Sequence, residues 1–174
     1  MILKPDLVAY VLFLALSLST TNKASASKND GCPYRWVRIG ESCYYYEKWK
    51  MHFDRAEVMC LQRGATTFVA NSLQEYNEVM SRTPKNSWAW TGLYQGVDDN
   101  RPKWKYPGGI DASQIKWLRT SPDHDWNTAS KCVAHYNSDS SYAQFYFCGM
   151  EFYSVCERNA TLLNQMWDPT AYGF

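Results

Sequence analysis

Apolar and polar residues follow strand-like and helical patterns in turn along the first part of the chain. Aromatic and β-branched runs at 34–39 and 42–47 flank Gly40-Glu41, and this pattern predicts a β-hairpin. Apolar positions then recur at helical spacing over 53–63, and Gly64 follows as a stop signal. We therefore expect a hairpin followed by a helix.

A second, shorter helix is predicted over about 72–82. Ser72 and Glu75 have the capping-box spacing, in which a hydroxyl and a carboxylate accept hydrogen bonds from free N–H groups at a helix start. Beyond this helix, five short aromatic or β-branched runs predict strands: 88–94, 104–106, 132–136, 145–148 and 153–157. The pattern of two helices followed by strands indicates an α+β fold.

The stretch from about 107 to 131 is mostly polar and long for a loop within a compact domain, which favours a functional role. Trp117 and Trp126 lie in it, and Tyr142 lies beside a loop. Such aromatic side chains can stack on a sugar ring or fill a partner's pocket, with core packing as the alternative. Three other tryptophans fall in predicted strands and are expected in the core: Trp88, Trp90 and Trp104.

The N-terminus has the features of a secretory signal peptide over residues 1–26. Lys4 precedes an apolar run at 7–18, and Ala24-Ser25-Ala26 supplies a small-residue cleavage pattern. The apolar run is too short to span a bilayer, although an uncleaved anchor or an amphipathic arm is the alternative. We therefore predict a secreted, extracellular protein without a membrane span, with 27–31 as a short segment before the domain.

Charge argues against nucleic acid as a partner. Lys and Arg total 18 against 17 Asp and Glu, and the two signs alternate along the chain. No basic stripe is therefore available to neutralise phosphates. The chain also carries eight Trp, thirteen Tyr and seven Phe, a load typical of packed β structure or of surfaces that bind ligands through flat contacts.

Six cysteines follow the predicted cleavage site, and an even number in an exported chain indicates disulfides. Zinc is the alternative, but no two cysteines are closer in sequence than Cys148 and Cys156, which does not fit C-x₂-C ligand spacing. The predicted hairpin can bring Cys32 opposite Cys43. Cysteine spacing alone leaves the other pairings open.

The ordered motifs of the chain resemble a C-type lectin-like domain of the long, six-cysteine form. They are Cys32, Cys43, Phe53-x-x-Ala56-x-x-x-Cys60, Gly64-Ala65, Ser72-x-x-Glu75, Trp90-Thr91-Gly92-Leu93, Trp104, Trp117, Cys132, Cys148 and Cys156. The resemblance covers 32–158 and leaves 159–174 as a C-terminal tail. It implies two helices packed on short antiparallel β-sheets, a long loop region, and the disulfides Cys32–Cys43, Cys60–Cys156 and Cys132–Cys148.

Family members that bind sugar hold calcium in the long loop, and the resemblance maps that site onto this chain. Ser121-Pro122-Asp123 stands where the family has Glu or Gln, Pro, then Asn or Asp. Ser130 stands at an acid position, and Ala143-Gln144-Phe145 replaces Trp-Asn-Asp. Only Asp123 keeps a carboxylate, whereas Ca²⁺ takes six to eight oxygen ligands, so we expect no cofactor, with Ca²⁺ as the alternative.

A second arrangement of oxygen side chains lies in the same loop. Asp123, Asp125 and Asn127 alternate as at the start of an EF-hand loop, which makes them weak metal candidates. Thr128 and Ala134 occupy the positions where that loop needs glycine and a bidentate glutamate. The pattern therefore favours a polar loop with an Asx turn over a metal site.

No motif of an enzyme is present. The chain has no G-x-S-x-G elbow, phosphate loop or H-E-x-x-H, and its three histidines are scattered. One modification is predicted, because Asn159-Ala160-Thr161 is an N-x-S/T acceptor for a glycan in a secreted protein.

We therefore expect a secreted recognition module rather than an enzyme. The leading hypothesis is carbohydrate binding through the long loop, with an extracellular glycan or glycoprotein as partner. The mapped ligand-binding residues are Ser121, Pro122, Asp123, Trp126, Ser130 and Gln144. The alternative is a calcium-independent protein-binding or matrix module on the same scaffold, which has lost sugar binding.

Overall fold

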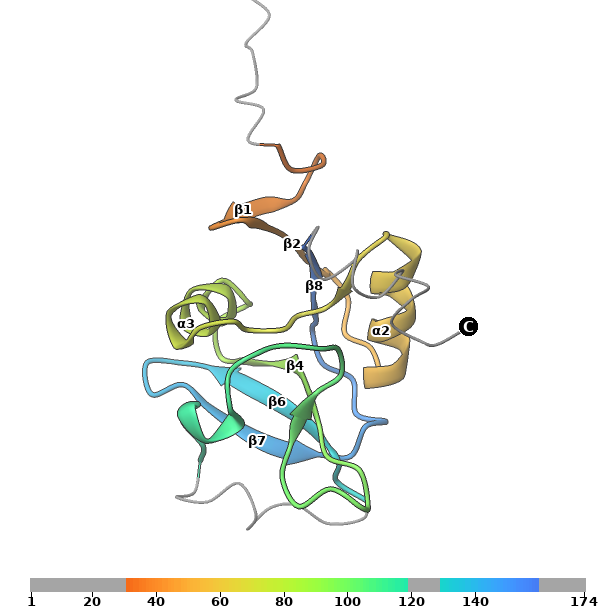
Figure 1. Ribbon diagram of the computed structural model, residues 1–174, viewed down its shortest axis with the longest axis vertical. Coiled ribbons are helices and arrows are strands. Elements are labelled where there is room, and N and C mark those ends of the chain that lie inside the picture. Colours follow the sequence, from red (N-terminus) through yellow and green to blue (C-terminus); the bar gives the residue numbers. More distant parts are fainter. Residues whose placement is uncertain (1–30, 119–128, 160–174) are drawn as a thin grey trace, which may run out of the picture. The chain divides into compact units, whose positions relative to one another are not determined.

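The computed structural model describes residues 31–118 and 129–159 (Figure 1). The predicted signal peptide at 1–26, most of the 27–31 segment and residues 160–174 of the predicted tail lie outside this part of the chain. Within it, no helix combines the length and apolar character needed to cross a membrane.

The first sheet joins the two ends of the domain. Its strand order is β1-β2-β8-β3, and the pairs are antiparallel: β1 (Val37–Ile39), β2 (Ser42–Tyr46), β8 (Val155–Arg158) and β3 (Thr66–Thr67). The predicted hairpin is present as β1 and β2. The last strand of the domain, β8, therefore pairs with strands from its beginning (Figure 1).

Both predicted helices form with the expected boundaries, within one residue. Helix α2 (Phe53–Gln62) buries Phe53, Ala56 and Cys60 on one face, as the helical spacing predicts. Helix α3 (Leu73–Ser81) starts at Ser72, whose Oγ accepts a hydrogen bond from the backbone N–H of Glu75 at 3.1 Å. The capping box thus fixes where α3 begins.

The second sheet is built from aromatic-rich strands that follow α3 in the sequence. Its strand order is β5-β4-β6-β7, again antiparallel: β5 (Lys103–Trp104), β4 (Ser87–Tyr94), β6 (Cys132–Asn137) and β7 (Tyr142–Tyr146). Gly92 in β4 has a positive φ, and a Cβ there would lie 2.2 Å from the carbonyl oxygen of Phe68. Only glycine allows this close backbone approach.

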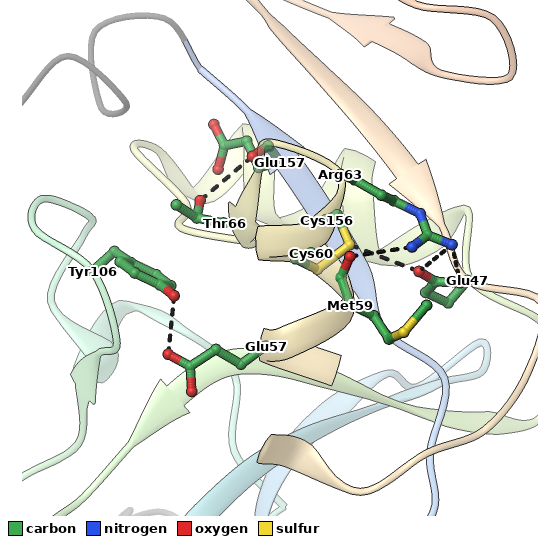
Figure 2. Close-up of a disulfide and its surroundings, with 9 residues drawn as sticks. All are labelled: Glu47, Glu57, Met59, Cys60, Arg63, Thr66, Tyr106, Cys156 and Glu157. Atoms are coloured by element: carbon green, nitrogen blue, oxygen red, sulfur yellow. Dashed lines mark hydrogen bonds and ion pairs between the residues drawn. A yellow bond between two sulfur atoms is a disulfide. The ribbon is translucent and has the colours of Figure 1, made fainter. Parts of the chain in front are cut away.

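Three disulfides stabilise the fold, and they join the pairs that the resemblance implies: Cys32–Cys43, Cys60–Cys156 and Cys132–Cys148. Figure 2 shows the second of these, which ties α2 to β8. Beside it, Glu47 forms an ion pair with Arg63 at 3.0 Å. Burial raises the pKa of Glu47, and the Arg63 charge opposes that rise.

The main core cluster draws on both sheets and on α3, with Tyr44, Tyr76, Leu93 and Phe145 among its members. Trp90 is buried as expected, whereas Trp88 and Trp104 are half-buried against core clusters. Aromatic residues of the predicted strands therefore fill the core and also line its margin.

Two parts of the sequence prediction need correction. The strand predicted at 145–148 is β7 and begins earlier, at Tyr142, because that residue pairs with Tyr136 across the hairpin. Strand β3 and a short 3₁₀ helix, η1 (Ala112–Gln114), were not predicted. A two-residue strand has no measurable alternation, and η1 depends on Asp111, whose side chain accepts from the Ser113 N–H at 2.9 Å.

Candidate recognition site

The described ends of the long loop meet two neighbouring strands of the second sheet, the edge strand β7 and the inner strand β6. On one side, the Leu118 N–H donates to the Ala143 carbonyl at 3.0 Å, and the Ala143 N–H donates to the Lys116 carbonyl at 2.8 Å. On the other side, Lys131 precedes Cys132, which pairs with Tyr146. The loop therefore leaves the described fold beside Ala143 of β7 and rejoins it at the start of β6.

The residues predicted for the site divide into two groups. Ser121, Pro122, Asp123, Asp125, Trp126 and Asn127 lie outside the described residues. Ser130, at the return of the loop, and Gln144, in the middle of β7, are described and half-buried. Asn159 follows β8 of the first sheet, whereas β7 belongs to the second sheet, so Asn159 does not belong to this group.

One face of β7 belongs to the core. Ala143 is fully buried and Phe145 is 3% exposed. The Trp117 ring stacks on Phe145 with centroids 5.4 Å apart, and the Trp117 indole N–H donates to the Ala112 carbonyl at 2.9 Å. The position where the family pattern has a calcium-ligating aspartate is therefore occupied by a core ring.

The other face of β7 carries Tyr142, Gln144 and Tyr146, because side chains alternate along a strand. The neighbouring strands add Tyr136 from β6 and Trp88 from β4 to the same face. The Trp88 ring centroid lies 4.9 Å from that of Tyr136, 5.7 Å from that of Tyr142 and 4.7 Å from that of Tyr146. We call these four rings the aromatic shelf.

Polar groups at the shelf are available for a ligand. Within the described residues, no hydrogen bond engages the Gln144 amide, the Trp88 indole N–H or the hydroxyls of Tyr136 and Tyr142. The shelf residues are half-buried. The Phe152 ring packs on Trp88 and Tyr146, so only parts of the shelf rings remain accessible. The accessible parts of these tilted rings, beside such donors and acceptors, can bind a molecule that is itself apolar on one face and polar at its edge.

The opposite side of β6 holds a different kind of group. His135 is 5% exposed, and its Nδ1 lies 3.1 Å from the Tyr76 hydroxyl. Burial lowers the pKa of His135 to about 4, so the imidazole is neutral at physiological pH. This histidine is a structural part of the core and does not face the shelf.

Across residues 31–118 and 129–159, no group of three or more His, Cys, Asp and Glu side chains is placed to hold a metal ion. In the Asp98-Asp99-Asn100 segment, Asp99 accepts from the Gly96 N–H at 3.0 Å and pairs with Lys103. Asp99 thus closes a turn, and these hydrogen bonds lower its pKa.

Sequence reasoning placed Trp88 in the core and did not connect it with Tyr136. Tyr136, Tyr142 and Tyr146 are visible in the sequence as aromatic residues, but Phe145 and Phe147 between or beside them hide which of them share a face. The shared face becomes visible only when the hairpin register is known, because Tyr136 pairs with Tyr142 and Trp88 pairs with Tyr136.

Comparison with known proteins identifies the class to which this fold belongs. Residues 49–158 match the family described as Lectin C-type domain. The C-type lectin domain-containing protein 91 of Caenorhabditis elegans is 36% identical over 149 residues, covering 79% of this chain and 66% of that protein. The chain therefore belongs to the C-type lectin domain family, and it spans about two thirds of the length of this relative.

Solved structures show the same fold. A Ca²⁺-dependent type II antifreeze protein in its Ca²⁺-free form has a TM-score of 0.65 and 21% identity, covering 74% of this chain and 100% of that one. The C-type lectin domain of murine dendritic cell inhibitory receptor 2, in complex with N-glycan, has a TM-score of 0.64 and 22% identity, covering 74% and 98%. The domain thus has the C-type lectin fold, in agreement with its family.

Proposed function

We propose that this chain is a secreted recognition module that binds carbohydrate at the edge of its second sheet, without the calcium site of its family. The observation that carries the proposal is the placement of Gln144. Its unpaired amide lies on β7 between Tyr142 and Tyr146, on the face that also carries Tyr136 and Trp88.

A pyranose ring matches this surface in shape and chemistry. Its C–H face is apolar and can lie on an aromatic ring, while its hydroxyls project from the edge. Burial of the apolar face contributes about 25 cal/mol per Å², and a hydrogen bond to Gln144 contributes about 0.5–1.5 kcal/mol. A few such contacts give weak binding of a single sugar, so several copies or several sugar residues increase the effective affinity.

Strand β7 supplies too few oxygen ligands for a calcium ion. Phe145 is a core residue stacked on Trp117, and it offers no oxygen to a metal. Gln144 offers one neutral amide oxygen, which balances the charge of a divalent ion less well than a carboxylate does. Asp123 and Trp126 of the long loop are proposed to complete the sugar contacts beside Gln144, together with Ser121, Pro122 and Ser130.

The test is binding of the secreted chain to a broad glycan panel, run in parallel with calcium and with a chelator. We expect signals that are the same in both conditions. Gln144→Ala should weaken binding by about fivefold to tenfold, the equivalent of one hydrogen bond. Gln62→Ala removes an exposed glutamine from the end of α2 and should leave binding unchanged.

Other outcomes contradict parts of the proposal. Signals that vanish with chelator would show a functional calcium site and would overturn calcium independence. Silence in both conditions would favour the second candidate, a protein-binding or matrix module on the same scaffold. The observation in favour of that candidate is Phe145, because a core ring stands where sugar-binding relatives need a ligand.

A further inference from the structure

A polar cluster that the proposed function does not use lies buried in the first sheet. Glu157 of β8 is fully buried. Its Oε2 accepts from the Val69 N–H at 3.0 Å, and its Oε1 accepts from the Ser42 hydroxyl at 2.8 Å. The Tyr44 hydroxyl oxygen lies 3.5 Å from the same Oε1.

A second carboxyl group shares the Tyr44 hydroxyl. The Tyr44 hydroxyl donates a hydrogen bond to Oε1 of Glu75, and the Asn71 N–H donates one to Oε2 of Glu75 at 2.5 Å. Burial raises the pKa of Tyr44, so this hydroxyl keeps its proton. Since the proton points to Glu75, Tyr44 can offer only a lone pair to Glu157.

The direction of the remaining hydrogen bonds is also fixed. The Asn159 amide donates to the Ser42 Oγ at 3.0 Å, so the Ser42 proton is free to point to Glu157. Glu157 therefore accepts from Val69 and Ser42, and the Asn159 side chain also interacts with its carboxyl group. A protonated Glu157 carboxyl could donate a hydrogen bond to the Tyr44 oxygen, which would link Glu157 to Glu75 through Tyr44. An ionised Glu157 would face that oxygen with no hydrogen between them.

No positive charge compensates this cluster. Among the described residues, neither Glu157 nor Glu75 forms an ion pair. The titratable groups that face Glu157 are Tyr44 from β2 and Glu75 from α3, while β3 contributes the Thr66 hydroxyl, which donates to the Glu157 carbonyl at 3.4 Å. Burial raises the pKa of Glu157 to about 7. Hydrogen bonds from Val69, Ser42 and Asn159 oppose this rise, and the Glu75 charge reinforces it.

We propose that Glu157, Tyr44 and Glu75 form a proton-dependent clasp that holds β8, the β1–β2 hairpin and the start of α3 together. The clasp is closed when Glu157 carries its proton. Loss of that proton leaves a buried carboxylate aimed at Tyr44 and Glu75, and the contact between β8 and α3 weakens.

The structure also offers a way for the clasp to open. A cavity of about 300 Å³ lies beside it, lined by Ile39, Gly40, Ser72, Gln74, Glu75 and Glu78. Glu75 is therefore both a clasp residue and part of the cavity wall. Water entering from this side reaches Glu75 first, so loosening is expected at the start of α3 and at the hairpin.

The sign of the pH effect follows from linkage. A carboxyl whose pKa is raised on folding stabilises the fold fully below its unfolded pKa, which is about 4.3 for Glu. That stabilisation is lost as pH rises through about 7. The clasp therefore favours the closed domain in mildly acidic surroundings.

The direct test needs no substitution. In the intact chain, the side-chain carboxyl carbon of Glu157 is titrated by NMR, together with the backbone amides of Val69 and Asn71. We expect a Glu157 midpoint near pH 7, with both amides shifting at the same midpoint, because one donates to Glu157 and the other to Glu75. A midpoint near 4, or an Asn71 amide that does not follow Glu157, overturns the clasp.

A variant set adds an independent readout. His135 titrates in the opposite direction, so we use His135→Gln as the background and measure unfolding by urea at pH 5 and 7.5. The unfolding constant of this variant should rise about fiftyfold between the two pH values. Adding Glu157→Gln should abolish the rise, whereas Glu41→Gln on the exposed hairpin turn should leave it intact. A pH-independent unfolding constant in His135→Gln contradicts the proposal.

Discussion

The two sheets of this domain bury opposite kinds of titratable group. The first sheet encloses Glu157, a carboxyl that burial holds in its neutral form up to about pH 7. The second sheet encloses His135, an imidazole that burial holds neutral down to about pH 4. Each group sits beside a tyrosine hydroxyl, Tyr44 in one case and Tyr76 in the other.

When an acid and a base are both buried, their opposite effects on the pH dependence of the unfolding free energy can cancel. Between about pH 5 and 7, rising pH removes the stabilisation from Glu157 and restores that from His135. The two slopes have similar size and opposite sign. A flat pH profile of the intact protein therefore hides two large local effects.

Disulfide removal is expected to have the largest effect on stability. In the chain-entropy model, replacing Cys60 and Cys156 by alanine should cost about 4–5 kcal/mol, because this bond spans 96 residues. Replacing Cys132 and Cys148, 16 residues apart in the second sheet, should cost about 3 kcal/mol. Urea unfolding of the two double variants checks the order, and equal losses would contradict it.

Truncation of Phe145 is the next largest test, and it addresses the second sheet. Phe145→Ala should cost about 3–4 kcal/mol, because the ring is buried and stacks on Trp117. Phe145→Asp should be at least as destabilising and should not create calcium binding, since a carboxylate at this site is buried. Thermal unfolding with and without calcium measures both, and a calcium-dependent gain in Phe145→Asp would show a latent metal site.

The third largest effect is expected on the pH dependence of stability, when Glu157 is substituted and His135 is left in place. Glu157→Gln should make the protein less stable as pH falls from 7.5 to 5, by about 2 kcal/mol, because only His135 then titrates. The intact protein should change by less than about 1 kcal/mol over the same range. Urea midpoints at the two pH values decide, and parallel profiles of variant and parent would show that Glu157 does not titrate there.

The smallest effect is expected from an accessible ion pair. Lys105 lies 3.2 Å from Glu57 on α2. Tyr106 also donates to Glu57, at 2.9 Å (Figure 2). Lys105→Ala should cost about 0.5 kcal/mol, since solvent screens this pair and Tyr106 still supplies a partner for Glu57. Arg63→Ala is the contrasting variant and should cost more, because Glu47 is 4% exposed.

Much of this fold could be predicted from local patterns in the sequence. The helical spacing of Phe53, Ala56 and Cys60 and the capping box at Ser72 gave both helices. The two-residue strand β3 could not be predicted, because its pairing depends on β8, which is distant in the chain. Sequence periodicity describes neighbours along the chain and contains little about partners across a sheet.

The candidate site was harder to predict for the same reason. Gln144 was found through the family pattern, but its ring neighbours come from three strands that only the register brings together. The burial of Glu157 was also hidden, since a charged residue beside a cysteine gives no local sign of an apolar environment. Features built by long-range pairing, such as the shelf and the clasp, required the structure.

The measurement that tests the central functional claim most directly is NMR of the Gln144 side-chain amide in the presence of chelator. Methyl glycosides of common hexoses and their N-acetylated forms would be added in turn to the purified chain. Our account predicts saturable shifts of the Gln144 amide and of the Tyr142 ring for at least one sugar, with the Gln62 amide unchanged. Shifts that occur only after calcium is restored, or that spare Gln144, would contradict it.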